Sequence, residues 1–326
     1  MNSVVIAGVG KYIPSKVVTN DMLSHIVDTS DEWIVSRTGI KQRHITTSEN
    51  TSDIASEAAL NAIKDANIDA CDIDLIIVAT CTPDMHTPAT ACIVQKNIGA
   101  KNAFAFDLGA ACSGFIYGIN VAKSMMISNN IKKALVIGAE TLSKAIDWQD
   151  RSTCVLFGDG AGAVVLSLSE NEGILDVVCK SKGAKWENLT IGAKDLNNPY
   201  IDEKIDINPY LSMNGSEIFK FATVEMVKLI IQILKDNNLS LEDIDYIVPH
   251  QANERIIQFA AKKLEIPVDK FYINIDEYGN TSAASIPIAI SEMKEKNLLK
   301  KGNKLIAVGF GAGLTSGACL IKWQDN

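Results

Sequence analysis

Short apolar runs alternate with amphipathic segments along most of the chain, and this alternation predicts an α/β protein. The apolar runs are typical of strands buried on both faces of a sheet, because polar positions rarely interrupt them. Such strands are expected at residues 3–9, 72–82, 104–108, 131–138, 157–169, 243–249 and 302–309. Helices are expected at 51–66, 113–126 and 213–238, where apolar residues recur at helical spacing.

Two pairs of similar segments are separated by the same length of chain. DIDLIIV begins at Asp72 and DIDYIVP at Asp243, while IKKALVIG begins at Ile131 and GNKLIAVG at Gly302. We call this shared separation, from Asp72 to Asp243, the duplication offset. Two pairs in one register indicate the internal duplication of a domain-sized α/β unit.

This duplication divides the chain into two halves. We expect an N-terminal half at 1–172 and a C-terminal half at 173–326, with a polar, irregular connection at 180–215. Catalytic groups of α/β proteins usually follow buried strands. Two halves packed about a pseudo-two-fold axis would bring such strand ends together.

The stretch 104–126 carries the strongest candidate for chemistry. Phe104–Leu108 predicts a short strand, the small residues at 109–111 predict a tight turn, and a buried helix follows. Cys112 is therefore expected at a helix N-terminus, where the helix dipole and free N–H groups favour the nucleophilic thiolate. The alternative for this cysteine is a small side chain that fills a gap in the core.

His250 and Asn280 are the candidates in the other half. His250 follows an apolar run, and Asn280 lies in the Gly-bearing turn 278–282 before a helix. Taken alone, His250 is typical of a hydrogen-bonded core histidine, and Asn280 is typical of a helix-cap or turn residue. The duplication places both near Cys112, and a thiol, an imidazole and an amide in one cleft suit acyl transfer through a thioester. The N–H of Cys112 and the small-residue loop 309–313 are candidate donors to the oxyanion.

Composition and charge narrow the class of protein. The 326 residues are 47% hydrophobic and 21% charged, as in well-buried enzymes, and the net charge of −8 disfavours nucleic acid as a partner. Neither a membrane-spanning apolar run nor a basic leader is present, so we expect no membrane span and a cytoplasmic protein. Seven cysteines without paired spacing, and only four histidines, indicate reduced thiols and no metal site.

Residues 28–44 begin with a helix N-cap signature and place Trp33 near Arg37, Lys41 and Arg43. Ordinary packing with cation–π contacts explains this grouping. A platform for a nucleotide base, with cations for its phosphates, is the alternative. The residues alone favour packing.

Five motifs occur in order along nearly the whole chain: DTSDEWIVSRTGIKQRH, DLGAACSGF, FGDGAGA, VPHQAN and GNTSAAS. Together they closely resemble the motifs of the β-ketoacyl-acyl-carrier-protein synthase III family, the initiating condensing enzymes of type II fatty-acid synthesis. The resemblance implies a thiolase-like fold, with two similar α/β halves stacked as five αβαβα layers, and a homodimer. It also implies decarboxylative Claisen condensation of an acyl-CoA primer with malonyl-acyl-carrier protein, without a cofactor.

The matching motifs imply roles for single residues. By this resemblance Cys112 accepts the acyl group, His250 and Asn280 hydrogen-bond the malonyl thioester carbonyl, and the backbone N–H groups of Cys112 and Ala312 form the oxyanion hole. The implied coenzyme A contacts are Trp33, Arg37, Arg151 and Asn253, which reverses the preference for packing at Trp33. The implied carrier-protein contacts are Gln251, Ala252, Asn253, Glu254 and Arg255, with Lys262 and Lys263 as further cations for an acidic carrier.

Three positions are expected to bear on the acyl pocket: Thr87, Phe157 and Ser316. Thr87 stands where several family members carry a phenylalanine that bounds the pocket, and Ser316 replaces a common tryptophan. The smaller Thr87 leaves room, so the primer is expected to be longer or branched rather than only acetyl. Ala312 lies in a loop that is usually all glycine, but its backbone donor remains.

Other functions stay open at this stage. A related Cys-His-Asn condensing enzyme of secondary metabolism would carry the same three residues. A Cys-His-Asn hydrolase would release free acid from a thioester or amide without consuming malonyl groups. A carrier-binding subunit without catalysis would not need the nucleophile.

Overall fold

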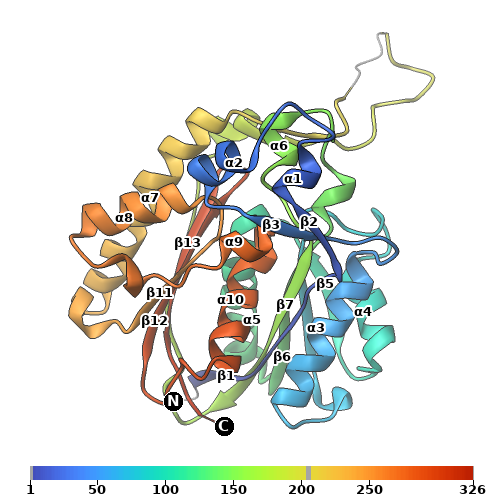
Figure 1. Ribbon diagram of the computed structural model, residues 1–326. Helices are drawn as coiled ribbons and strands as arrows, with labels where there is room; N and C mark the ends of the chain where they lie inside the picture. The colour runs from blue at the N-terminus through green and yellow to red at the C-terminus, as the bar shows by residue number, and fades with distance from the viewer. Residues whose placement is uncertain (1–2, 203–206, 326) are drawn as a thin grey trace.

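The computed structural model describes residues 3–202 and 207–325. Two β-sheets stand side by side, with one layer of helices between them and one layer on each outer face (Figure 1). This is the expected five-layer αβαβα arrangement. Each sheet is covered on both faces, which explains why the strands appear in the sequence as nearly continuous apolar runs.

The first sheet has the strand order β1-β7-β6-β4-β5. Its strands are β1 (Ser3–Tyr12), β4 (Leu75–Ala79), β5 (Phe104–Leu108), β6 (Lys133–Glu140) and β7 (Gly160–Ser169). β4 runs parallel to β5 and β6, and β7 runs antiparallel to β6 and β1. All of these strands come from the N-terminal part of the chain.

The second sheet has the order β11-β12-β13-β8 and comes from the C-terminal part. Its strands are β8 (Ile174–Ser181), β11 (Tyr246–Pro249), β12 (Lys304–Gly311) and β13 (Thr315–Lys322). Two small two-stranded sheets pair β2 (Lys16–Thr19) with β3 (Gln42–Ile45), and β9 (Leu189–Ile191) with β10 (Leu211–Met213). The stretch 180–215, expected to be irregular, therefore contains a short strand pair.

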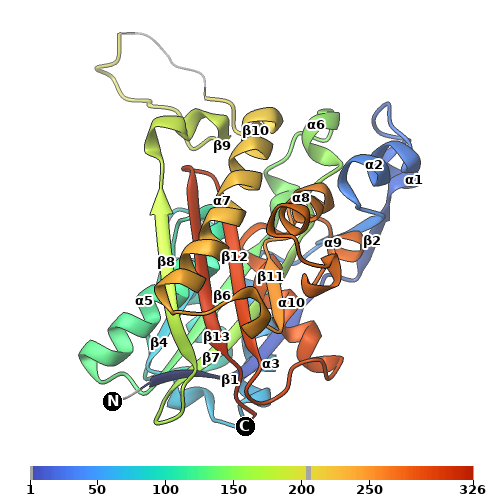
Figure 2. The same ribbon diagram turned by 90° about the vertical axis from the view of Figure 1, so that its left-hand side faces the viewer.

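The longer helices make the three helical layers. α3 (Thr51–Asp65) and α4 (Thr90–Ile98) cover the first sheet, and α5 (Gly114–Asn129) and α10 (Ser285–Glu295) lie between the sheets. α7 (Gly215–Asp236) and α8 (Glu254–Leu264) cover the outer face of the second sheet (Figure 2). The short helices are α1 (Asn20–Leu23), α2 (Asp31–Thr38), α6 (Arg151–Cys154) and α9 (Ile275–Tyr278). In the described parts of the chain, no helix is long and apolar enough to cross a membrane.

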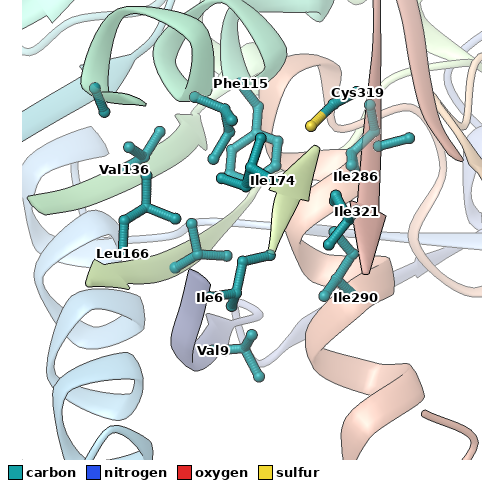
Figure 3. Packing of buried hydrophobic residues seen from close by; sticks show 14 of the residues in the cluster. Ile6, Val9, Phe115, Val136, Leu166, Ile174, Ile286, Ile290, Cys319 and Ile321 are labelled. Carbon is teal, nitrogen blue, oxygen red and sulfur yellow. The ribbon is translucent and has the colours of Figure 1, made fainter. Parts of the chain in front are cut away.

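The central core joins the two halves. Figure 3 shows Phe115 of α5 and Val136 of β6 packed in one cluster with Ile174 of β8, Ile286 of α10 and Ile321 of β13. Two further clusters lie between each sheet and its outer helices. Because neither half can cover its inner face alone, burial of this shared apolar surface holds the halves together.

The duplication inferred from the sequence recurs in the fold. The first residues of β1 and β8, of β4 and β11, and of β6 and β12 are all related by the duplication offset. The same offset relates two single-turn 3₁₀ helices, η2 (Ala111–Ser113) and η7 (Ser282–Ala284). The division at 172/173 falls between the last strand of one sheet and the first strand of the other, and as a domain boundary it stays a prediction.

Candidate active site

Cys112 lies in η2, directly before α5, between the two halves of the molecule. The turn is tight, because Ala111 adopts a left-handed φ of 45°. The end of β12 presses against it: a Cβ atom on Gly311 would lie 2.7 Å from the Cys112 nitrogen. Cys112 is consequently only 7% exposed and is held from both sides.

This burial corrects the expectation of a resting thiolate. Loss of solvent raises the pKa of the Cys112 thiol to about 12, although a contact with the Ser282 hydroxyl opposes part of the rise. The helix start is buried between the halves rather than exposed, so desolvation outweighs the effect expected from the helix end. The free protein therefore holds Cys112 as a protonated thiol at neutral pH.

His250 follows the last residue of β11 and is 1% exposed. Its backbone N–H donates to the Val308 carbonyl at 2.7 Å, which fixes the residue against β12. Its Nδ1 lies 2.8 Å from the Ser285 Oγ, and the Phe310 ring meets the imidazole edge to face at a centroid distance of 5.4 Å. Burial lowers the pKa of His250 to about 3, so the ring is neutral.

Asn280 is fixed through its backbone and its amide oxygen. Its N–H donates to the Leu156 carbonyl at 2.9 Å, and its own carbonyl accepts from the Gly158 N–H at 3.1 Å. The Oδ1 atom accepts from the Ser282 N–H at 2.9 Å. This bond identifies the opposite side of the amide as NH₂, which leaves two donor hydrogens for a ligand.

The three predicted side chains meet in one cavity. Cys112, His250 and Asn280 all line a space of about 200 Å³ that reaches the partly exposed Asn253. A second cavity of about 390 Å³ lies beside it, and Cys112 and Phe157 line both. The cysteine therefore has access to two adjoining spaces, both lined mainly by apolar atoms, and His250 and Asn280 line the first of them.

The predicted second oxyanion donor lies close to the nucleophile. Ala312 follows Gly311, the last residue of β12 that pairs with β13, so the strand ladder does not use the Ala312 N–H. Ala312 lines the second cavity together with Cys112. The backbone of this loop is therefore placed beside the thiol.

The three predicted acyl-pocket residues do not lie together. Phe157 lines both cavities, but Thr87 is exposed and lines neither of them within the single chain. Ser316 is buried in β13, paired in register with Phe310, and also lines neither cavity. The proposed roles of Thr87 and Ser316 therefore have no support from the geometry of one chain.

Trp33 of α2 packs between two cations. The Arg37 guanidinium carbon lies 4.5 Å from the Trp33 ring centroid, and that of Arg151 lies 4.8 Å from it. The cation–π packing favoured by the residues alone is thus present. Because Arg151 contacts the indole directly, a base can enter between them only if Arg151 moves.

Arg43 was grouped with the possible phosphate-binding cations, and the structure corrects this interpretation. It is fully buried, and its guanidinium donates to the Val18 and Val155 carbonyls and to the Asn20 Oδ1. Lys41 is exposed and pairs with Asp276 at 3.0 Å. Of the three basic residues near Trp33, only Arg37 lies against the ring.

The predicted carrier-binding stretch divides into an exposed and a buried part. Asn253 caps α8 and donates to the Arg37 carbonyl at 3.0 Å, and Arg255 is exposed. Gln251 is only 1% exposed, and its amide bonds the Pro249 and Tyr272 carbonyls inside the protein. The Gln251 side chain therefore points inward in this structure, and the carrier contact predicted for it stays a prediction.

A buried carboxyl group near Cys112 was missed in the sequence. Glu140, at the end of β6, is fully buried and accepts from Thr80, Cys81, Thr82 and Ser282. Burial raises the pKa of its carboxyl group. Nothing in the sequence pointed to Glu140. In the described residues, no group of three or more potential metal-ligating side chains is present.

Known proteins are similar to this chain over nearly its whole length. The family model of 3-oxoacyl-[acyl-carrier-protein] synthase III matches residues 106–183, and the model of its C-terminal part matches residues 234–323. The chain is 56% identical over 323 residues to the β-ketoacyl-[acyl-carrier-protein] synthase III of Clostridium acetobutylicum, covering 99% of both proteins.

Solved structures agree with these matches. The crystal structure of 3-oxoacyl-[acyl-carrier-protein] synthase III from Aquifex aeolicus VF5 superposes with a TM-score of 0.92 at 45% identity, covering 98% of this chain and 100% of that chain. The priming β-ketosynthase of the R1128 polyketide pathway gives 0.91 at 32% identity, covering 99% and 97%. This chain belongs to the β-ketoacyl-acyl-carrier-protein synthase III family.

Proposed function

We propose that this protein joins an acyl-CoA primer to malonyl-acyl-carrier protein, releasing CO₂ and coenzyme A and forming a β-ketoacyl-carrier protein. One observation carries the proposal: a thiol and two neutral hydrogen-bonding side chains line the same cavity. The thiol can hold an acyl group, and the two side chains can stabilise the enolate that decarboxylation produces. Each half of the molecule supplies one of these two parts.

In the first half-reaction, the Cys112 sulfur bonds to the primer carbonyl and the bond to the coenzyme A sulfur breaks. The proton of the Cys112 thiol is transferred to the coenzyme A sulfur, so this half-reaction leaves the net charge and the number of bound protons unchanged. The tetrahedral oxyanion is stabilised by the N–H groups of Cys112 and Ala312. One such donor typically lowers the activation barrier by about 3–4 kcal/mol.

In the second half-reaction, the malonyl thioester oxygen lies between His250 and Asn280. Loss of CO₂ places negative charge on that oxygen, and two neutral donors stabilise it without a metal ion. The carbanion then attacks the acyl group on Cys112, and the Cys112 thiolate leaves and takes up a proton. A neutral His250 suits this step, since burial lowers its pKa to about 3.

The second cavity supports a primer longer than acetyl. Its volume is about 390 Å³, and apolar side chains such as Leu142, Phe157 and Leu211 line it. A protein cavity of about 150 Å³ already holds a benzene molecule, so this space exceeds what a two-carbon group needs. We expect butyryl-CoA or isobutyryl-CoA to acylate Cys112 faster than acetyl-CoA does.

The surface around the first cavity supports the two predicted substrates. Trp33, Arg37 and Arg151 lie near α8 and offer an aromatic face with positive charge for the nucleotide part of coenzyme A. On α8 itself, Arg255, Lys262 and Lys263 are exposed. An acidic carrier would therefore meet a locally basic helix on a protein of net charge −8.

A homodimer would cover the free edge of the first sheet. β5 is the edge strand, and its Phe104 is 48% exposed, an arrangement that favours pairing with another strand. Asp107 of β5 accepts from the Thr90 N–H at 2.7 Å, so the exposed Thr87 lies close to this edge. A second copy on β5 would cover Thr87, and the pocket role predicted for Thr87 then depends on the dimer. Light scattering should give the mass of two chains, and the mass of one chain would contradict the dimer.

We also place the enzyme in the cytoplasm and expect it to need no cofactor. All seven cysteines are free, as expected in a reducing compartment. The half-reactions above balance without a redox group or metal ion.

A condensation assay tests the proposed function. The purified protein is incubated with labelled acetyl-, butyryl-, isobutyryl- and octanoyl-CoA and with malonyl-carrier protein, and the products are identified by mass spectrometry. A β-ketoacyl-carrier protein is expected. Release of free acid without that product would support a hydrolase and contradict the proposal.

The likeness to a polyketide priming ketosynthase, at 32% identity, favours a second candidate. In that case the same reaction would prime a polyketide rather than a fatty acid. Offering the malonyl group on carrier proteins of both kinds separates the two, since the physiological carrier should give the higher kcat/KM.

A further inference from the structure

His250 and Ser285 form a buried pair at the start of α10. The Ser285 Oγ lies 2.8 Å from the His250 Nδ1. Ser285 is 2% exposed and His250 is 1% exposed. Ser285 is the first residue of α10, which packs between the two sheets, so its backbone is firmly held. With Nδ1 turned towards Ser285, Nε2 is the ring nitrogen left for the cavity that His250 lines.

The hydrogen bonds around Ser285 limit where its hydroxyl hydrogen can go. The Gln251 N–H points at the Oγ at 3.4 Å and can only donate, so it occupies a lone pair. The Ser282 carbonyl, 2.9 Å from the Oγ, accepts the backbone N–H of Ser285 through one lone pair and can accept the hydroxyl hydrogen through the other. The hydroxyl hydrogen thus has two acceptors in reach, this carbonyl and the Nδ1 of His250 at 2.8 Å, and donation to Nδ1 is the arrangement that leaves the imidazole hydrogen on Nε2.

The chemical group that faces Nδ1 matters, because a hydroxyl can donate a hydrogen bond to this nitrogen and an ionised carboxylate cannot. A carboxylate at this place would keep a hydrogen on Nδ1 and favour the charged ring. Burial lowers the pKa of His250, and the group that faces Nδ1 is the Ser285 hydroxyl rather than a carboxylate. The hydrogen bond at one ring nitrogen sets the protonation of the other.

We propose that Ser285 is a positioning residue that donates its hydroxyl hydrogen to Nδ1 and so keeps the hydrogen of His250 on Nε2, facing the substrate carbonyl. This inference rests on the proposed function, because His250 can stabilise the malonyl enolate oxygen only as an Nε2–H donor. Ser285 itself does not touch the substrate. Its effect passes through the imidazole.

The tautomer of the resting enzyme is measured directly by NMR of protein labelled with ¹⁵N-histidine. The chain contains only four histidines, so the His250 signals are assigned by their loss in His250→Asn. We expect hydrogen on Nε2 and none on Nδ1 in the wild-type protein. Hydrogen on Nδ1 would overturn the proposal, whatever the enzyme catalyses.

Variants of Ser285 supply the kinetic test. Ser285→Ala should give a mixture of tautomers and should slow malonyl decarboxylation about 10- to 100-fold, the range seen when an orienting bond to a metal-bound imidazole is removed. KM for malonyl-carrier protein and the rate of Cys112 acylation should change little. Ser285→Thr keeps a hydroxyl and should restore the wild-type tautomer.

Ser291→Ala is the matched control, since Ser291 is a serine of the same helix that is 1% exposed. It should leave both spectrum and rates unchanged. If Ser285→Ala keeps the wild-type spectrum and decarboxylation rate, Ser285 has no positioning role. If instead the wild-type protein shows the Nε2–H tautomer but forms no β-ketoacyl product, the proposed function fails while the tautomer assignment stands.

Discussion

The two halves of this protein contain the same turn with different chemistry. η2 and η7 are single 3₁₀ turns related by the duplication offset, and their first residues, Ala111 and Ser282, have φ values of 45° and 49°. Each turn packs against a strand of the other half, η2 on β12 and η7 on β6. At the second position of the turn, one half has Cys112 and the other has Ala283.

The remaining reactive side chains follow the opposite pattern. The C-terminal residues His250, Asn280 and Ser285 correspond, at the same offset, to Ala79, Gly109 and Gly114 in the N-terminal half. Ala79 and Gly114, the counterparts of His250 and Ser285, also lie close to each other. A Cβ atom on Gly114 would lie 3.0 Å from the Ala79 Cβ. The backbone geometry is repeated, whereas the functional groups are not.

Under the proposed function, this difference divides the reaction between the two halves. The N-terminal turn holds the proposed nucleophile and the C-terminal elements hold the hydrogen-bonding groups, and each half has small side chains where the other has the proposed reactive ones. The small residues leave room at the junction for the groups of the opposite half. The geometry of a turn therefore does not define a site until its partner half is placed.

Cys112→Ala is expected to have the largest effect and makes the two turns alike. Without the thiol no acyl-enzyme can form, so incubation with acyl-CoA should leave the mass of the intact protein unchanged. Cys319→Ala is the control, because Cys319 is a buried thiol outside the two cavities. An acyl adduct on Cys112→Ala would show that another residue is the nucleophile.

His250→Ala, which reproduces Ala79, and Asn280→Ala remove the donors from the C-terminal half. Decarboxylation of malonyl-carrier protein should fall about 10²–10³-fold in each variant, as when one oxyanion donor is lost. Acylation of Cys112 should persist. Asn280→Asp keeps the shape but replaces the donor NH₂ by a charged acceptor, so it should be at least as slow. Labelled CO₂ release measures the effect, and a normal rate in either alanine variant would remove that residue from the mechanism.

Gly138 and Gly309 are equivalent positions that differ in how closely the opposite turn approaches. A Cβ atom on Gly138 would lie 2.1 Å from the Ala283 carbonyl oxygen, whereas on Gly309 the nearest atom, the Ile116 Cδ1, would be 3.4 Å away. Gly138→Ala should therefore destabilise the protein by about 1–3 kcal/mol or more, and Gly309→Ala by clearly less. Thermal unfolding compares them, and equal midpoints would contradict the difference in packing.

The neutral, buried His250 should add a pH dependence to stability that its counterpart Ala79 cannot. Its pKa falls from 6.5 to about 3 on folding, so the unfolded chain binds the extra proton between these values. Stability from this group is present above pH 6.5 and is lost as the pH falls, by up to about 1.4 kcal/mol per pH unit.

The contribution of His250 to the pH dependence of stability is isolated by comparing the wild-type protein with His250→Asn. The free energy of unfolding is measured by denaturant titration at about pH 7 and about pH 5, on either side of the ordinary histidine pKa. The wild-type protein and Asn280→Ala should lose more stability at the lower pH than His250→Asn does. Equal losses in all three proteins would mean that His250 is protonated in the fold.

The sequence predicted much of this architecture because the duplication left two strand pairs similar at one offset. That offset, read with the resemblance, placed Cys112, His250 and Asn280 together, and the structure brings them into one cavity. Buried strands were equally visible, since sheets covered on both faces require continuous apolar runs. Fold and reactive groups thus depended on patterns that survive in a linear chain.

What the sequence did not predict depends on which way side chains turn and on how much water reaches them. Burial makes Cys112 a protonated thiol, turns Gln251 inward and encloses Arg43 completely. Glu140 was missed because it is a single acidic residue at the end of a strand, and only packing brings it near Cys112. These properties arise where the halves meet, so they cannot be read from either half alone.

The most direct test of the division between the halves measures both half-reactions in the same two variants. Cys112→Ala should form no acyl-enzyme yet still release CO₂ from malonyl-carrier protein, because His250 and Asn280 remain. His250→Ala should become acylated yet release CO₂ about 10²–10³-fold more slowly than the wild-type protein. If instead each variant loses both half-reactions together, the chemistry is not divided between the two halves in this way.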